Sequence, residues 1–139
     1  MNSGISPTEE HVEEFNLLKM KGLNKILIFS LNAEMNKLEL LFKADKAFQY
    51  DDLKAMLPND DCRFVVYDFD YETLESPPRK TSKLILIYWA PIAAPMKRKF
   101  TFSSTKGALK SAFIGIQKDL QPSDWSDLER EHVTKEIRK

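Results

Sequence analysis

The sequence predicts an α/β protein of the α+β type, with helices on both faces of a largely antiparallel or mixed sheet of about five strands. Four apolar runs rich in β-forming residues and helical patterns at both ends of the chain predict this class. Its 139 residues fit one domain, 1–139, with residues 1–6 as a flexible, exposed tail.

The strands are predicted from runs of β-forming residues. Residues 25–31 (KILIFSL) and 37–42 (KLELLF) flank a segment with turn character and are expected to form a hairpin. Residues 62–71 and 83–89 predict two more strands, joined by a polar segment whose Pro-Pro cannot lie in a central strand. The alternation Phe-Thr-Phe at 100–102 predicts a short fifth strand.

Four helices are predicted from capping signals and apolar spacing. The first, 7–20, begins with Ser-Pro-Thr-Glu, a capping box with proline at the first helical position. A short helix at 50–57 ends before a proline. The hydroxyl residues at 103–105 supply N-cap candidates for a helix over 105–118, and a last, strongly charged helix covers 124–138.

The side chains give no pattern for catalysis. With only four glycines the chain contains neither a P-loop nor a dinucleotide fingerprint. His11 and His132 are predicted to be solvated, and Cys62, the single cysteine, to be buried and inert. Carboxylates alternate with aromatic residues over 67–72, which predicts a polar strand face rather than a calcium loop. We therefore expect no enzyme, no metal and no cofactor.

The net charge of zero conceals an asymmetry. Residues 1–78 carry 8 basic and 15 acidic side chains, a net charge of −7, whereas residues 79–139 carry 13 and 6, a net charge of +7. A compact domain with this division has a basic face, which selects acidic partners. The longest apolar run, 84–94, is too short to span a bilayer, and residues 1–10 lack a leader pattern, so we expect a cytoplasmic protein that does not span membranes.

The segment 95–113, PMKRKFTFSSTKGALKSAF, concentrates this positive charge. A helix N-terminus favours carboxylates, yet lysines and an arginine surround the predicted start at residue 105. On that helix Ile114 falls between Lys106 and Lys110, which fits equally an interface anchor in a basic rim and a solvated face. A nucleic-acid partner is not favoured, because Phe100 and Phe102 are expected on the core face of the short strand.

The same region resembles the ADF/cofilin family. SKLILIYWAPIAAPMKRKFTFSSTKGALKSAFIGIQ contains, in order, a Ser-Lys, an apolar strand ending in Trp-x-Pro, an Ala-Pro, a K/R-x-K, an aromatic segment, a hydroxyl pair with lysine and a long helix. Further matches lie at 3–5, 15–19, 57–63 and 67–71. The resemblance implies the ADF-homology fold, a five-stranded mixed sheet between helices. It also implies binding of actin monomers and filaments, with preference for ADP-actin, and depolymerisation and severing of filaments.

The family pattern implies two binding surfaces on this chain. Carried over by position, the monomer-binding residues are Ser3, Gly4, Ile5, Lys97, Lys99, Lys106, Lys110 and Ile114. The filament-binding residues are Lys80, Lys83, Lys135, Glu136 and Arg138.

The resemblance also bears on regulation. It implies phosphorylation of Ser3, whose added charge would repel an acidic partner, and competition from phosphoinositides for the basic face. Ile92 and Gly107 depart from the family pattern, since acidic residues usually stand at both positions. We expect a monomeric protein of the actin cytoskeleton.

Two alternatives stay open. One is a coactosin-like protein that binds filament sides without severing, although the Trp-x-Pro and Ala-Pro elements favour the cofilin branch. The other is a phosphoinositide-binding or RNA-binding module that uses the basic face, which steep salt dependence without actin affinity would reveal.

Overall fold

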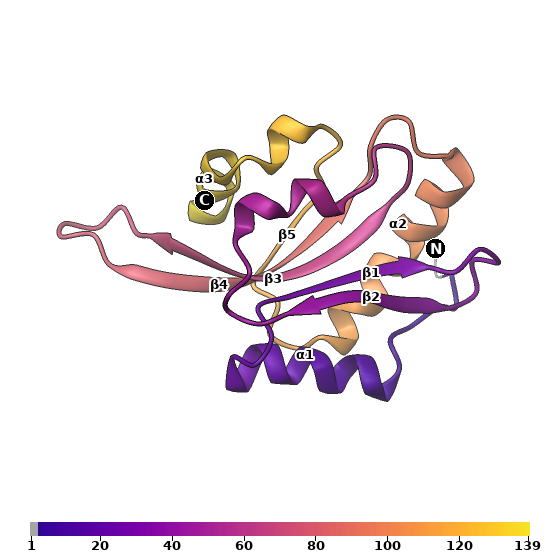
Figure 1. Cartoon of the computed structure of the whole chain (residues 1–139), viewed down its shortest axis with the longest axis horizontal. Helices are drawn as coiled ribbons and strands as arrows, with labels where there is room; N and C mark the ends of the chain where they lie inside the picture. The colour runs from indigo at the N-terminus through magenta and orange to yellow at the C-terminus, as the bar shows by residue number, and fades with distance from the viewer. Residues whose placement is uncertain (1–2) are drawn as a thin grey trace.

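The computed structural model describes residues 3–139 and has three layers, with a sheet between helical layers (Figure 1). The five strands are ordered β2-β1-β3-β4-β5. Every neighbouring pair is antiparallel except β4 and β5, which are parallel, so the sheet is mixed. The predicted fold class is therefore confirmed.

Four strands lie where the apolar runs predicted them: β1 (Ile26–Leu31), β2 (Leu38–Ala44), β3 (Arg63–Glu72) and β4 (Lys80–Trp89). β1 and β2 form the predicted hairpin, and β1 is buried along its whole length. β3 and β4 pair over ten residues each, and their ends project beyond the rest of the molecule (Figure 1).

The fifth strand was wrongly placed. Residues 100–102 lie in a helix, α2 (Met96–Ala112), and β5 is the polar segment Lys118–Leu120. β5 pairs with β4 in parallel. Two parallel strands need a crossover connection that returns the chain to the same end of the sheet, and α2 lies in that connection. Three residues without apolar alternation give no signal that a sequence pattern could detect.

The first helix begins two residues later than predicted. α1 spans Glu9–Lys21, and its N-cap is Thr8, not Ser6. The Thr8 side chain accepts a hydrogen bond from the amide of His11, and the His11 Nδ1 atom accepts one from the Thr8 amide, at 3.1 Å. A capping box is present, but a histidine closes it.

Two other helices are shorter than predicted. Residues 50–57 form two 3-10 turns, η1 (Tyr50–Asp52) and η2 (Lys54–Met56). The helix predicted at 124–138 is divided by the extended backbone of Glu129 into η3 (Trp125–Leu128) and α3 (Arg130–Arg138). Single helical turns have little intrinsic stability. In each case, therefore, the burial of a few apolar side chains determines the backbone conformation.

The sheet separates two apolar clusters. On one face α1 and α2 bury Phe15, Leu18, Phe102, Leu109 and Phe113 against the strands. On the other, the 3-10 turns and α3 bury Tyr50, Leu53, Leu128, Val133 and Ile137. Cys62 is buried as predicted. No helix within residues 3–139 is long and apolar enough to cross a membrane.

Candidate functional site

The basic segment is the beginning of α2, not a strand followed by a helix start. Pro95 is the N-cap; it provides no side-chain hydrogen bond, and the first turn contains no acidic residue. In a helix, residues two apart point to nearly opposite sides, and Phe102 is fully buried whereas Phe100 is 63% exposed. The prediction that both rings face the core was therefore wrong for Phe100.

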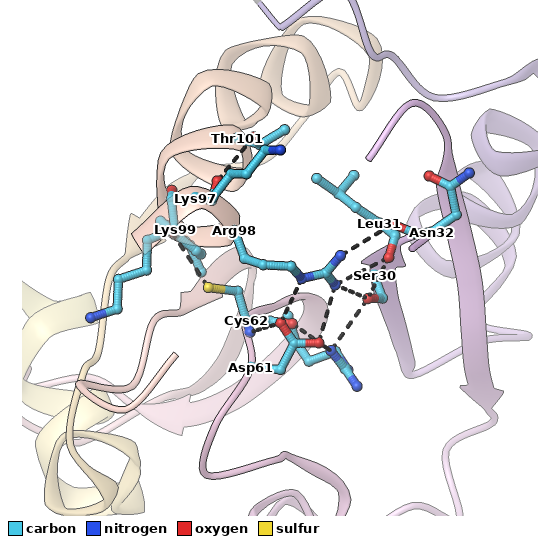
Figure 2. A network of polar contacts seen from close by, with 11 residues as sticks. Ser30, Leu31, Asn32, Asp61, Cys62, Lys97, Arg98, Lys99 and Thr101 are labelled. Atoms are coloured by element: carbon cyan, nitrogen blue, oxygen red, sulfur yellow. Dashed lines mark hydrogen bonds and ion pairs between the residues drawn. The ribbon is translucent and has the colours of Figure 1, made fainter. Parts of the chain in front are cut away.

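The cations of the first turn do not share one role, as Figure 2 shows. The guanidinium of Arg98 points into the molecule, where its Nε and Nη2 atoms donate to the two oxygens of Asp61 at 2.9 and 3.1 Å. It also donates to the carbonyls of Leu31 and Asn32, both at 3.1 Å, at the end of β1. Arg98 therefore joins α2 to the sheet and is not available to a partner.

Asp61 is the carboxylate that the basic segment lacked in sequence. Besides Arg98 it accepts from Arg63 Nη1 at 2.8 Å and from the Cys62 amide at 2.8 Å. Burial alone would raise the pKa of Asp61, but these hydrogen bonds and the Arg98 charge lower it below its usual value. Asp61 is thus an anion throughout the physiological range.

Beside this network α2 presents apolar side chains to solvent. Met96, one turn before Phe100, is 78% exposed. Lys97 is exposed, and Lys99 is half-buried, its Nζ atom donating to the Ile92 carbonyl at 2.9 Å. Two large apolar groups between cations are typical of the centre of a protein interface. Met96 and Phe100 were not predicted as site residues. Pro95 was a signal that a helix begins there, because proline is common at the start of a helix.

Lys106 and Lys110 lie one turn apart on α2 and share a carboxylate of β5. Their Nζ atoms lie 3.4 and 3.5 Å from Asp119 Oδ2. Burial raises the pKa of Asp119, but the two ammonium charges outweigh it and lower that pKa. Both lysines lie on the side of α2 away from the core, as the helical pattern predicted. Their charge is nevertheless partly neutralised by Asp119.

The C-terminal end of α2 is held by α1. Ile114 lies just beyond the helix, not on its face as predicted, and is 72% exposed. Its carbonyl accepts from Lys19 Nζ at 2.7 Å, a cation placed where a helix end favours one. Gly115 follows with φ 116°, and a Cβ there would approach the Lys19 side chain to 3.0 Å.

The N-terminal segment lies against α2, so the expectation of an exposed tail is wrong for Ile5, which is 5% exposed in the core. Ser3 Oγ lies 2.7 Å from Thr105 Oγ1 and accepts from the Ile5 amide at 3.2 Å. Between them Gly4 has φ 80°, a conformation that glycine adopts without strain. The structure therefore brings Ser3, Gly4 and Ile5 next to the middle of α2.

The residues predicted for the filament surface lie where α3 meets the β3–β4 hairpin. Lys83 Nζ donates to the Ile137 carbonyl at 3.1 Å, and Arg138 Nε donates to the Glu72 carbonyl at 3.0 Å. Glu136 accepts from Lys139, a hydrogen bond that lowers its pKa. Two of the predicted cations, Lys83 and Arg138, thus connect α3 to the β3–β4 hairpin through backbone carbonyls.

The other two filament-surface cations face solvent. Lys80 pairs opposite Glu72 at the start of β4, and Lys135 lies on α3. Both are exposed, which leaves their charges to the surroundings. The predicted filament residues therefore gather in one region, divided between structural and solvent-facing groups.

The remaining polar candidates have structural partners. His11 is half-buried and so only partly solvated, in contrast to the prediction: its ring packs edge-on against Phe29 at 5.3 Å, and burial lowers its pKa. The carboxylates of β3 share one face, as predicted, and Lys25 Nζ lies 2.6 Å from Asp70. No group of three His, Cys, Asp or Glu among residues 3–139 could hold a metal ion.

The longest helix of this three-layer α/β domain exposes apolar side chains between cations, an arrangement typical of protein-binding modules. The family model described as cofilin/tropomyosin-type actin-binding protein matches residues 4–138. A cofilin of Kluyveromyces lactis is 35% identical over 136 residues, 97% of this chain and 93% of the relative. The chain belongs to the ADF/cofilin family of actin-binding proteins, which confirms the resemblance seen in sequence.

Solved structures agree with this assignment. The crystal structure of a Streptomyces griseoflavus cofilin superposes with a TM-score of 0.85 at 34% identity, covering 96% of this chain and 97% of that one. A coactosin from Entamoeba histolytica has a TM-score of 0.75 at 21% identity, covering 98% and 96%. The fold by itself therefore does not separate the cofilin and coactosin branches.

Proposed function

We propose that this protein binds actin monomers and filaments, prefers ADP-actin, and promotes filament turnover by depolymerisation and severing. Family membership supports the partner. The observation that carries the proposal is the exposed face of α2, where Met96 and Phe100 stand among lysines and Ile114 follows at the helix end. An apolar strip with a basic rim suits an apolar cleft with an acidic rim.

The monomer-binding surface in this proposal combines α2 with the N-terminal segment. Its members are Ser3, Gly4, Ile5, Lys97, Lys99, Lys106, Lys110 and Ile114, to which we add Met96 and Phe100. Because Ile5 is buried and Ser3 bonds Thr105, the segment contributes mainly through Ser3 and Gly4. A module of residues 1–139 that acts as a monomer in the cytoplasmic actin cytoskeleton fits this role.

A second surface around Lys80, Lys83, Lys135, Glu136 and Arg138 contacts the neighbouring subunit of a filament in this proposal. It lies where α3 meets the β3–β4 hairpin, and α3 covers the face of the sheet opposite α2, so one molecule can contact two subunits at once. Severing then follows if binding is tighter to a twisted filament than to a relaxed one, a shift of population and not a chemical step.

The main test is co-sedimentation with filaments, together with monomer affinity and direct observation of severing. We expect wild type to sediment with filaments. Lys97→Ala/Lys99→Ala should bind monomers about tenfold or more weakly, because two cations at the rim are lost. Lys46→Ala, which removes one exposed charge from the loop after β2, is the control and should bind like wild type.

Each outcome has a distinct meaning. Wild type that stays in the supernatant at all salt concentrations contradicts actin binding and leaves the basic face to phosphoinositides or RNA. Binding without severing indicates a coactosin-like filament side-binder. A double variant that binds monomers as tightly as wild type contradicts the site but not the function.

Regulation at Ser3 is part of the proposal. Thr105 Oγ1 donates to the Thr101 carbonyl at 2.7 Å, so the hydrogen between Ser3 and Thr105 comes from Ser3. A phosphate there has no such hydrogen and adds about −1.5 to −2 charges beside the basic face. Ser3→Glu should depolymerise filaments more slowly than Ser3→Ala; equal rates would remove this switch.

A basic face of this kind should also attract phosphoinositide headgroups, as the sequence predicts. In the proposal, they compete with actin for Lys97 and Lys99. Vesicles that contain phosphatidylinositol 4,5-bisphosphate should reduce monomer binding, whereas vesicles of phosphatidylcholine alone should not. Equal effects of the two vesicles would contradict the competition.

A further inference from the structure

The beginning of α2, which is part of the proposed monomer-binding surface, lacks the local features that usually stabilise a helix start. Its N-cap is a proline without a side-chain hydrogen bond, and its first turn holds three cations and no carboxylate. A capping side chain normally satisfies one of the free amide groups there, and positive charge is unfavourable beside them. Local sequence therefore works against helix at the turns that carry Met96, Lys97 and Phe100.

The contacts that oppose this tendency come from distant parts of the chain. Arg98 Nε and Nη2 donate to both oxygens of Asp61, a two-point contact that fixes direction as well as distance. The same guanidinium donates to Leu31 and Asn32 carbonyls and lies 5.3 Å from the centre of the Phe102 ring. Figure 2 shows Arg98 entering this network while the Lys99 ammonium points away from it.

We propose that Asp61 and Arg98 are positioning residues for the proposed actin-binding surface: their ion pair holds the first two turns of α2 in the helical form that binding needs. This inference rests on the proposed function. In it, neither residue touches the partner. Both act through Met96, Lys97 and Phe100, whose side chains take their directions from these turns.

Asp61→Asn separates positioning from simple charge. The change makes the protein more positive by one unit and so, through long-range attraction alone, would strengthen binding to an acidic partner. Positioning predicts the opposite, because an amide offers Arg98 one neutral acceptor in place of two charged oxygens. We expect monomer affinity to fall about three- to tenfold, as for loss of a charge-assisted hydrogen bond.

The neighbouring residue provides a matched control. Asp60 is exposed and has no hydrogen bond or ion pair to the other described residues, so Asp60→Asn makes the same charge change one position away. It should bind monomers as tightly as wild type or slightly more tightly. Tyr50→Phe, which removes the hydrogen bond from Tyr50 to the Leu128 carbonyl in the opposite layer, controls for general destabilisation.

Hydrogen exchange gives a readout that does not depend on actin. Amides in the segment 99–102 should exchange at least several-fold faster in Asp61→Asn than in Asp60→Asn or Tyr50→Phe. Amides at the C-terminal end of α2, near Leu109, should be unchanged relative to the global stability of each variant. Arg98→Lys keeps the charge without the two-point contact and should fall between wild type and Arg98→Gln in both exchange and affinity.

The outcomes distinguish this inference from the proposed function. Weaker binding of Asp61→Asn with faster local exchange supports it. Affinity equal to that of Asp60→Asn, or a loss equal to that of Tyr50→Phe, overturns it while actin binding stands. If wild type binds no actin, the proposed function fails, and exchange in 99–102 that is equal in all variants overturns the positioning role independently. Should Arg98→Gln not fold, the comparison of Asp61→Asn with Asp60→Asn decides alone.

Discussion

The two basic surfaces of the protein hold similar numbers of predicted cations but use them differently. On the α2 surface Lys97 is exposed, Lys99 donates to one nearby backbone carbonyl, and Arg98, which was not predicted as a site residue, joins the helix to the sheet. On the α3 surface two of the predicted residues, Lys83 and Arg138, bond the backbone themselves. The number of cations in a segment therefore does not give the charge that a partner meets. That charge depends on which cations are already bonded within the molecule.

The largest expected effect tests how α2 is seated. Phe102 is fully buried and packs against Phe64 and Tyr88, so Phe102→Ala should lower the free energy of unfolding by about 3–5 kcal/mol. Phe100→Ala should change it by less than about 0.5 kcal/mol but weaken monomer binding. Chemical denaturation and monomer titration measure the two. Similar destabilisation by both changes would contradict the helical assignment.

On the α3 surface a change at Lys83 should reduce stability. Lys83→Met keeps an unbranched apolar chain but removes the ammonium, which donates to the Ile137 carbonyl and lies 6.0 Å from the centre of the Tyr71 ring. We expect a loss of about 1 kcal/mol in the free energy of unfolding, the usual size for one such hydrogen bond. Lys135→Met on the same surface, an exposed residue, is the control and should leave stability unchanged. Equal stabilities of the two variants would show that the Lys83 contact is not structural.

A change of pH should affect the α1 side of the molecule. Burial lowers the pKa of His11 from 6.5, so the folded state binds this proton less readily than the unfolded chain. The stability contributed by neutral His11 is therefore present above about pH 6.5 and decreases as pH falls through the lowered pKa. Protonation also removes the Nδ1 acceptor that closes the α1 capping box.

The corresponding measurement is the melting temperature at about pH 7.5 and pH 5.5. His11→Gln keeps an acceptor at the third helical position and removes the titration. The wild type should lose more stability than His11→Gln on acidification, because only the wild type carries a group whose pKa is lower in the folded state. Identical losses would assign the pH dependence to other groups.

The smallest effect concerns the lysines that Asp119 neutralises. Asp119→Asn should free Lys106 and Lys110 and increase the association rate with actin monomers about two- to threefold at low salt. Stopped-flow binding at low and high salt measures this. Asp124→Asn is the control. It makes the same charge change at a carboxylate that accepts a hydrogen bond from Ser126 at the start of η3 and forms no ion pair with either lysine. A gain that persists at high salt would not be electrostatic.

Much of the fold was predictable because long apolar runs leave few alternatives. β1 to β4 lie within a few residues of the predicted strands, since runs such as KILIFSL must be buried. The errors fall on short or ambiguous segments. Phe-Thr-Phe at 100–102 alternates like a strand, but its two rings lie on different sides of a helix. β5 is recognisable only by its partner β4.

The sequence by itself determined the fold class, the family and the position of the basic segment, because these depend on local composition and on the order of motifs along the chain. The tertiary structure decided what each charge does. Asp61 meets Arg98 across 37 positions, and Asp119 reaches back to Lys106 and Lys110. Such pairs follow from packing helices onto a sheet, which no local pattern records, and they leave Lys97 exposed while Arg98 holds its helix.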